Sequence, residues 1–321
     1  MRRAAAGELA FIDWIRKRIG APAGGRRRTR LLSTAVGPGD DCALLACGAG
    51  GLVAITTDML LEGAHFSTTQ MSAERIGRKA LAVGLSDVAA MGMEPAAAVV
   101  AAALSRKSSM EFARRLMRGM MALARRHRVE IVGGDVTSWS QGIVLCVTVL
   151  GRPCGAKPVL RSGARVGDDV FVTGPLGGSI LRKHWAFEPL VADGAALARR
   201  YRVHAMIDVS DGLSTDLMHI CEESGAGATI EAAGVPVSAT ARTLARRDGR
   251  SPLEHALHDG EDFELLFTAD PRGRARILEG RSLTRKPRLV GRIEREPGLR
   301  IRDPRGKLSR LEPRGYEHTW G

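Results

Sequence analysis

The sequence has few aromatic residues and lacks the signatures of several common protein classes. Phe, Trp and Tyr make up 4% of the 321 residues, so recognition of single-stranded nucleic acid by base stacking has little support. No GxxxxGK[ST], HExxH or GxSxG motif occurs, which argues against a P-loop enzyme, a zinc hydrolase and an α/β-hydrolase. No apolar run reaches about 18 residues, so no membrane span is expected.

The termini and the cysteines indicate a cytoplasmic protein. The N-terminal sequence MRRAAAGELAFIDWIRK has no long apolar core and no convincing cleavage site, so no signal peptide is predicted. The five cysteines contain no CxxC pair, which favours free thiols in a reducing compartment over disulfides or a zinc site. They are Cys42, Cys47, Cys146, Cys154 and Cys221.

The net charge of +13 comes mostly from arginine. Such a surface can bind nucleic acid or attract an anionic substrate, and it can also consist simply of solvated arginines. The clearest basic run, Arg26–Arg28 with Arg30, lies in a Gly/Pro-rich segment. No role for this run follows from the sequence.

The length predicts two domains, each able to bury its own core. Residues 152–157 are rich in Pro and Gly, so we expect the domains to span residues 1–152 and 153–321. Apolar periodicity predicts helices over residues 8–19, 73–92 and from about 109 onward, with Ser72 as an N-cap and Ser108 with Glu111 as a capping box. Buried strands are predicted over residues 52–58, 94–104 and 142–151, although residues 94–104 can also be helical by propensity. Residues 129–137 are predicted to be a strand that leads into a turn at the two glycines of VGGD, so the fold is mixed α/β.

The segment of residues 36–66 contains three carboxylates in conspicuous positions. Asp40 and Asp41 follow a Gly-Pro-Gly turn, and Asp58 comes at the predicted end of the strand LVAITTD, directly after Thr56 and Thr57. Carboxylate and hydroxyl oxygens are ligands that Mg²⁺ prefers. The alternative is that the first two are solvated turn residues and that Asp58 caps the following segment.

The same arrangement, a carboxylate beside a strand or helix end, recurs along the chain. GLSD, VEIVGGD and MIDVSDG add Asp87, Asp135, Asp208 and Asp211. If these ends converge on one cleft, the carboxylates would repel each other strongly without counter-ions. Mg²⁺ would relieve the repulsion, and protein-bound Mg²⁺ commonly accompanies phosphates, so the pattern favours Mg-phosphate chemistry.

Two further features remain open on the residues alone. The Gly-rich turn TGPLGGS follows the predicted strand DVFVTG and can bind phosphate through backbone N–H groups. His65, in GAHF, can contact an anionic substrate or can be an ordinary loop histidine with internal partners.

From about residue 8 to residue 316 the chain resembles the thiamine-monophosphate kinase family, which belongs to the aminoimidazole ribonucleotide synthetase-like superfamily. The motifs GPGDDCALL, TTDMLLEGAHF, GLSDVAAMG, VGGDVT, MIDVSDGLSTDL and GEDFELLF occur in the family's order. The resemblance implies a two-domain α/β fold in which the N-terminal sheets of two subunits pair into a barrel. The implied reaction is direct in-line transfer of phosphate from ATP to thiamine monophosphate, with several Mg²⁺ ions.

The resemblance also implies roles for individual residues. Positions matching Mg²⁺ ligands are Asp41, Thr56, Thr57, Asp58, Asp87, Asp135, Asp208 and Asp211. Positions matching nucleotide contacts are Gly134, Asp135, Arg161 and Ser210. Positions matching contacts to thiamine monophosphate are His65, Glu261 and Tyr316. No residue is expected to form a covalent intermediate, since the Mg²⁺ ions and Arg161 would stabilise the transfer.

Three positions depart from the family pattern. Gly84 precedes LSD where Asn is usual, and Leu190 lies where many members have Arg. His127 would have to replace an aromatic nucleotide contact. The alternatives to the kinase are another ATP-dependent enzyme of this superfamily acting on a different small acceptor, and a basic nucleic-acid-binding protein without enzymatic activity.

Overall fold

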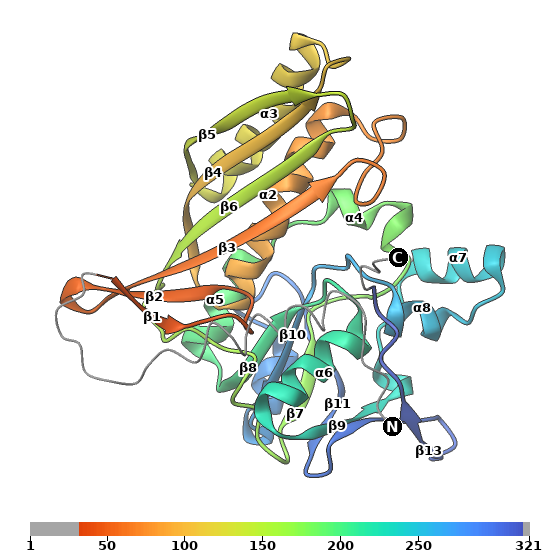
Figure 1. Ribbon diagram of the computed structural model, residues 1–321. Coiled ribbons are helices and arrows are strands. Elements are labelled where there is room, and N and C mark those ends of the chain that lie inside the picture. Colours follow the sequence, from red (N-terminus) through yellow and green to blue (C-terminus); the bar gives the residue numbers. More distant parts are fainter. Residues whose placement is uncertain (1–31, 317–321) are drawn as a thin grey trace, which may run out of the picture.

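The structure, a computed structural model, describes residues 32–316. Two β-sheets with helices packed against them make up this part of the chain (Figure 1). The helix predicted over residues 8–19 and the basic run Arg26–Arg30 lie outside the described residues. No helix within residues 32–316 is both long and apolar enough to span a membrane.

The first sheet has the strand order β1-β2-β3-β6-β4-β5. Its pairs are antiparallel except for the parallel pair of β4 and β5. Helices α2 and α3 cover one face, behind the strands in Figure 1. The elements are β1 (Leu32–Val36), β2 (Ala43–Cys47), β3 (Gly51–Leu61), α2 (Ala73–Ala90), β4 (Glu94–Ser105), α3 (Met110–His127), β5 (Glu130–Trp139) and β6 (Val144–Arg152).

The second sheet has the order β13-β12-β9-β11-β7-β10-β8. Its strands are β7 (Asp169–Val172), β8 (Val203–Asp208), β9 (Gly227–Glu231), β10 (Leu265–Ala269), β11 (Arg288–Glu294), β12 (Gly298–Arg302) and β13 (Leu308–Leu311). The helices around it are α4 (Lys183–Ala186), α5 (Val191–Arg200), α6 (Leu213–Ser224), α7 (Ala239–Asp248), α8 (Pro252–His258) and α9 (Arg274–Glu279). The fold is therefore mixed α/β, as the sequence predicts.

Helix α2 connects the two halves of the molecule. It packs on α3, β3 and β6 of its own half and on α5 and β8 of the other half. The contact with α5 is close, since a Cβ on Gly194 would lie 2.1 Å from the Ala89 carbonyl oxygen. The contact with α3 is equally close, because a Cβ on Gly77 would lie 2.0 Å from the Leu116 carbonyl oxygen. These approaches fix the helix firmly between the two sheets.

Several element predictions are confirmed. Ser72 caps α2 by accepting a hydrogen bond from the Arg75 backbone N–H. The helix predicted from about residue 109 forms as α3 and buries Leu116, Met120 and Leu123. The strands predicted over residues 94–104 and 142–151 form as β4 and β6.

Three local predictions are wrong. Strand β3 does not end at Asp58 but continues to Leu61, because its pairing with β6 extends that far. The VGGD segment is not a turn, since β5 runs through it beside β4, with a register shift that absorbs one residue. Helix α3 is capped by Ser109, which accepts from the Phe112 N–H, and not by Ser108, whose own N–H donates to the Ser105 carbonyl.

Candidate active site

Four of the predicted metal ligands meet where the two halves touch. We call Asp41, Asp58, Asp87 and Asp208 the carboxylate cluster. Asp58 lies on β3, Asp87 near the end of α2, and Asp208 at the end of β8. Thr56 Oγ1 donates to Asp87 Oδ2 at 2.5 Å, and Ser86 Oγ donates to Asp208 Oδ2 at 2.5 Å. These contacts join the two sheets through α2.

The alternation of strand β3 decides which of its side chains reach the cluster. Thr56 and Asp58 are two residues apart and project from the same face of the strand. The side chain of Thr57 projects from the other face, where its Oγ1 lies 3.0 Å from Thr148 Oγ1 on β6. The structure thus brings Thr56 and Asp58 to the cluster and leaves the side chain of Thr57 away from it.

The electrostatics of the cluster disfavour four negative charges. Burial, together with repulsion from the nearby Asp41, raises the pKa of Asp58 to about 6 and that of Asp208 to about 8. At Asp87, burial and then repulsion from Asp58 and Asp208 raise the pKa well above its usual value. Without cations, the protein therefore disfavours the simultaneous ionisation of these four groups near neutral pH.

Arg161 is the cation closest to this cluster in the described chain. Its Nη2 donates to Asp41 Oδ1 at 2.6 Å, and its backbone N–H donates to Asp40 Oδ1 at 3.1 Å. Burial opposes the charge of Arg161, but the neighbouring Asp41 raises its pKa above the usual value. Burial, followed by repulsion from Asp41, raises the pKa of Asp40 to about 7.

The donor set fits metal ions that bind together with phosphates. Within residues 32–316, Asp41 Oδ2 and Asp58 Oδ2 are buried without a hydrogen-bond partner, a costly state for an anionic oxygen. No three His, Cys, Asp or Glu side chains of the described chain already form a metal-binding group. Mg²⁺ commonly binds one or two carboxylates and takes its remaining ligands from water and phosphates. The cluster fits such a shared site, because it offers carboxylate oxygens but not a complete set of protein ligands.

The DVSDG loop after β8 is braced from two sides. The Ser210 carbonyl accepts from the Glu261 N–H at 2.7 Å, and the Asp211 carbonyl accepts from the Tyr316 N–H at 3.2 Å. Inside the loop, Asp216 Oδ2 accepts from the N–H groups of Asp211 and Gly212. Three predicted site residues, Ser210, Glu261 and Tyr316, therefore come together around one loop.

Two of the three residues predicted to contact the acceptor, His65 and Glu261, lie beside α2. The His65 carbonyl oxygen and Glu261 Oε1 both accept from Lys79 Nζ, at 2.7 and 2.6 Å. Tyr316 is about half exposed at 53%. The sequence reasoning missed Lys79, although a lone lysine among the apolar positions of an amphipathic helix is a recognisable signal.

Gly134 and Asp135 lie apart from the cluster, on the exposed edge strand β5. Gly134 is required by strand packing, because a Cβ there would lie 1.8 Å from the Val100 carbonyl oxygen. Among the departures, Leu190 is a buried core residue, and His127 Nε2 lies 3.0 Å from Glu188 Oε1. Gly84 faces Asp58: a Cβ there would lie 3.5 Å from its orphaned Oδ2.

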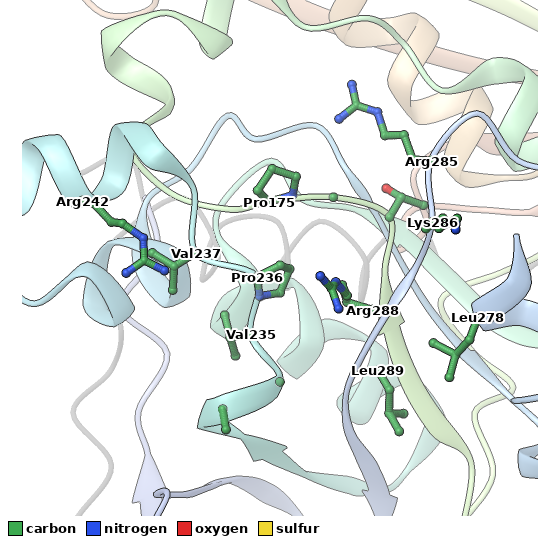
Figure 2. A pocket seen from close by; sticks show the side chains of 14 residues that line it. Pro175, Val235, Pro236, Val237, Arg242, Leu278, Arg285, Lys286, Arg288 and Leu289 are labelled. Atoms are coloured by element: carbon green, nitrogen blue, oxygen red, sulfur yellow. The ribbon is translucent and has the colours of Figure 1, made fainter. Parts of the chain in front are cut away.

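A hollow of about 870 Å³ lies elsewhere, at the end of β7 (Figure 2). Figure 2 shows Arg242, Arg285, Lys286 and Arg288 around it. None of the predicted site residues lines it. The carboxylate cluster, which contains the predicted metal ligands, is thus separate from this basic hollow.

Comparison with known proteins places most of the chain in one group. The families named AIR synthase related protein, N-terminal domain, and AIR synthase related protein, C-terminal domain, match residues 39–152 and 186–303. A thiamine-monophosphate kinase of Rhodopirellula baltica is 40% identical over 307 residues, covering 91% of this chain and 94% of the relative. One of Mycobacterium tuberculosis is 37% identical over 277 residues, covering 81% and 80%.

Solved structures of thiamine-monophosphate kinases are also similar to this chain. The structure described as AaThiL complexed with AMPPCP and TMP has a TM-score of 0.75 and 29% identity, and covers 99% of both chains. Thiamine-monophosphate kinase from Stenotrophomonas maltophilia has a TM-score of 0.70 and 33% identity, and covers 85% of this chain and 92% of that one.

Proposed function

The chain belongs to the thiamine-monophosphate kinase family of the AIR synthase related proteins and is an enzyme. We propose that it makes thiamine diphosphate by direct in-line transfer of the ATP γ-phosphate to thiamine monophosphate. The observation that carries the proposal is the carboxylate cluster at the junction of the two halves. Its buried, mutually repelling carboxylates are suited to cations that arrive with polyphosphate.

We assign the cations as Mg²⁺ held by Asp41, Asp58, Asp87 and Asp208, with Thr56 beside them. When bound, Mg²⁺ neutralises the phosphate oxygens and aligns them for displacement. Asp135, Asp211 and Thr57 stay proposed ligands from the family resemblance. The support from this chain is the pair of orphaned oxygens, Asp41 Oδ2 and Asp58 Oδ2.

Arg161 is proposed to bind the nucleotide phosphates. Its side chain is 22% exposed, and its pairing with Asp41 fixes the direction of the guanidinium. A planar guanidinium suits phosphate oxygens through two parallel hydrogen bonds. Gly134, Asp135 and Ser210 complete the proposed nucleotide contacts.

The acceptor is proposed to lie between His65, Glu261 and Tyr316. The acceptor group is itself a phosphate, whose second pKa is about 6, so it is mostly dianionic at neutral pH and needs no general base. The work left to the protein is to hold two anions in line. No phosphorylated enzyme intermediate is expected.

A homodimer is part of this proposal, with the N-terminal sheets of two copies paired into a barrel. Strand β5 is a sheet edge, and its Val132 and Val136 are 59% and 71% exposed. An exposed apolar edge strand is a natural pairing surface. A second copy would also cover Asp135.

A cytoplasmic location stays a prediction, supported by five cysteines that form no disulfide.

The test is ³¹P NMR of the purified protein with ATP and thiamine monophosphate, with Mg²⁺ or with excess EDTA. A new diphosphate signal that EDTA abolishes is expected. A diphosphate signal that persists in EDTA would contradict the metal assignment alone. Silence with thiamine monophosphate, together with ATP turnover on another small phosphate acceptor, would overturn the substrate.

A further inference from the structure

Lys79 is a fully buried cation in the middle of α2. Its side chain is 0% exposed, and its helical neighbours Ile76 and Ala80 are buried core residues. Burying an ammonium ion costs several kcal/mol unless partners compensate. A lysine therefore stays at such a position only where its three N–H groups find acceptors.

The partners of Lys79 come from both halves of the molecule. Its Nζ lies 2.7 Å from the His65 carbonyl oxygen, in the loop that follows β3, and 2.6 Å from Glu261 Oε1, in the loop that precedes β10. A third contact, at 3.4 Å, reaches His184 Nδ1 on α4. One ammonium group thus touches both loops that are proposed to bind the acceptor.

Glu261 is held by contacts of its backbone and its Oε1, while part of its side chain stays exposed to solvent. Its backbone has φ of +60°, an unusual value for a residue with a side chain, and its N–H is bound to the Ser210 carbonyl. Its Oε1 is bound to Lys79, its Oε2 lies 3.5 Å from His184 Nδ1, and its side chain is still 31% exposed. Burial opposes the negative charge, but His184 and Lys79 lower the pKa of Glu261 below its usual value.

Resting on the proposed function, we propose that Lys79 is a positioning residue for the acceptor, because its ammonium holds the His65 loop and the Glu261 carboxylate at one fixed separation. The ionised outer face of Glu261 is then presented to the donor groups of the thiamine part. Lys79 itself is buried behind these residues and does not touch the acceptor.

This role predicts a specific kinetic pattern. Lys79→Met keeps the length and apolar stem but removes the charge and all three donors. Because the substitution removes the charge-assisted hydrogen bonds that hold both loops, we expect the KM for thiamine monophosphate to rise about tenfold or more. The KM for ATP should stay within about twofold, since the cluster contacts of Asp87 on the same helix are unchanged.

Arg274→Met provides a matched control. Arg274 binds the buried Asp169 through two contacts of 2.7 Å in the other half of the chain. Its loss also strips a buried carboxylate of its cation, so stability should fall while both KM values stay at the wild-type level. Lys79→Gln is the second test variant; its amide can still donate hydrogen bonds, so it keeps the test open if Lys79→Met does not fold.

The experiment measures initial rates for wild type, Lys79→Met, Lys79→Gln and Arg274→Met, each checked for folding by thermal denaturation. A raised acceptor KM at unchanged ATP KM in a folded Lys79 variant supports the role. An unchanged acceptor KM, or an equal rise in both KM values, overturns the positioning role of Lys79. The proposed function still stands in that case if the wild type makes thiamine diphosphate. No thiamine diphosphate from the wild type overturns the proposed function, and the positioning role with it.

Discussion

Asp58→Asn should stabilise the metal-free protein while it abolishes turnover. Asp58 is held where burial and the neighbouring Asp41 raise its pKa from 3.8 to about 6. A shift of that size corresponds to about 3 kcal/mol at about 1.36 kcal/mol per pKa unit. Allowing for relaxation and water entry, we expect the free energy of unfolding at pH 7 to rise by about 1–3 kcal/mol in the variant.

The gain should depend on pH in a defined direction. A carboxyl group with a raised pKa contributes stability that is fully present below its unfolded value of 3.8 and is lost as the pH rises through about 6. Wild type should therefore lose stability between about pH 4 and pH 6 relative to the variant. The two proteins should converge towards pH 4 and differ most at pH 7 and above.

Urea denaturation in EDTA at several pH values, together with the ³¹P assay in Mg²⁺, measures both effects. Asp303→Asn is the control, since Asp303 accepts backbone N–H groups in the turn between β12 and β13, and its loss should leave turnover unchanged. A variant no more stable than wild type at pH 7 would refute the electrostatic reasoning. Retained turnover at ordinary Mg²⁺ would refute the role of Asp58 as a metal ligand.

Three further outcomes follow from the site and the edge strand. His65→Ala should raise the KM for thiamine monophosphate about tenfold, equivalent to about 1.4 kcal/mol, without changing that for ATP; an unchanged acceptor KM in steady-state kinetics would make His65 an ordinary loop residue. Arg161→Lys should keep the charge but lose bidentate binding, so kcat/KM for ATP should fall about tenfold to a hundredfold; a wild-type value would exclude a phosphate contact. Val136→Lys on β5 should shift the protein from dimer to monomer in light scattering after size-exclusion chromatography, with Met121→Lys on α3 as an exposed apolar control; a dimer in both variants would place the interface elsewhere.

In the sequence, several carboxylates lie beside predicted strand or helix ends, which makes their convergence on one cleft possible. Asp41, Asp58, Asp87 and Asp208 do meet, and the N-cap at Ser72 confirms the start of the helix that carries Asp87. Strand alternation alone would have separated Thr57 from Thr56 and Asp58. That separation follows from the strand predicted over residues 52–58 alone, because successive side chains of a strand point to opposite faces.

Other features depend on contacts between distant segments. Two adjacent glycines in VGGD suggest a turn, but Gly134 allows β5 to approach the Val100 carbonyl of β4, a distance that no local pattern encodes. The choice of Ser109 over Ser108 as the cap depends on a turn formed with Ser105. The partners of Lys79 likewise come from loops far apart in the sequence, so only the tertiary fold reveals them.

Because α2 carries both Lys79 and Asp87, it fixes the distance between the acceptor loops and the carboxylate cluster. The two positions are eight residues apart in sequence, which corresponds to about 12 Å along the helix axis. Inserting or deleting one residue there would shift one end by about 1.5 Å and rotate it by about 100° relative to the other. In a library of single-residue insertions, residues 80–86 should therefore tolerate none, whereas side-chain substitutions around the acceptor loops leave this spacing unchanged.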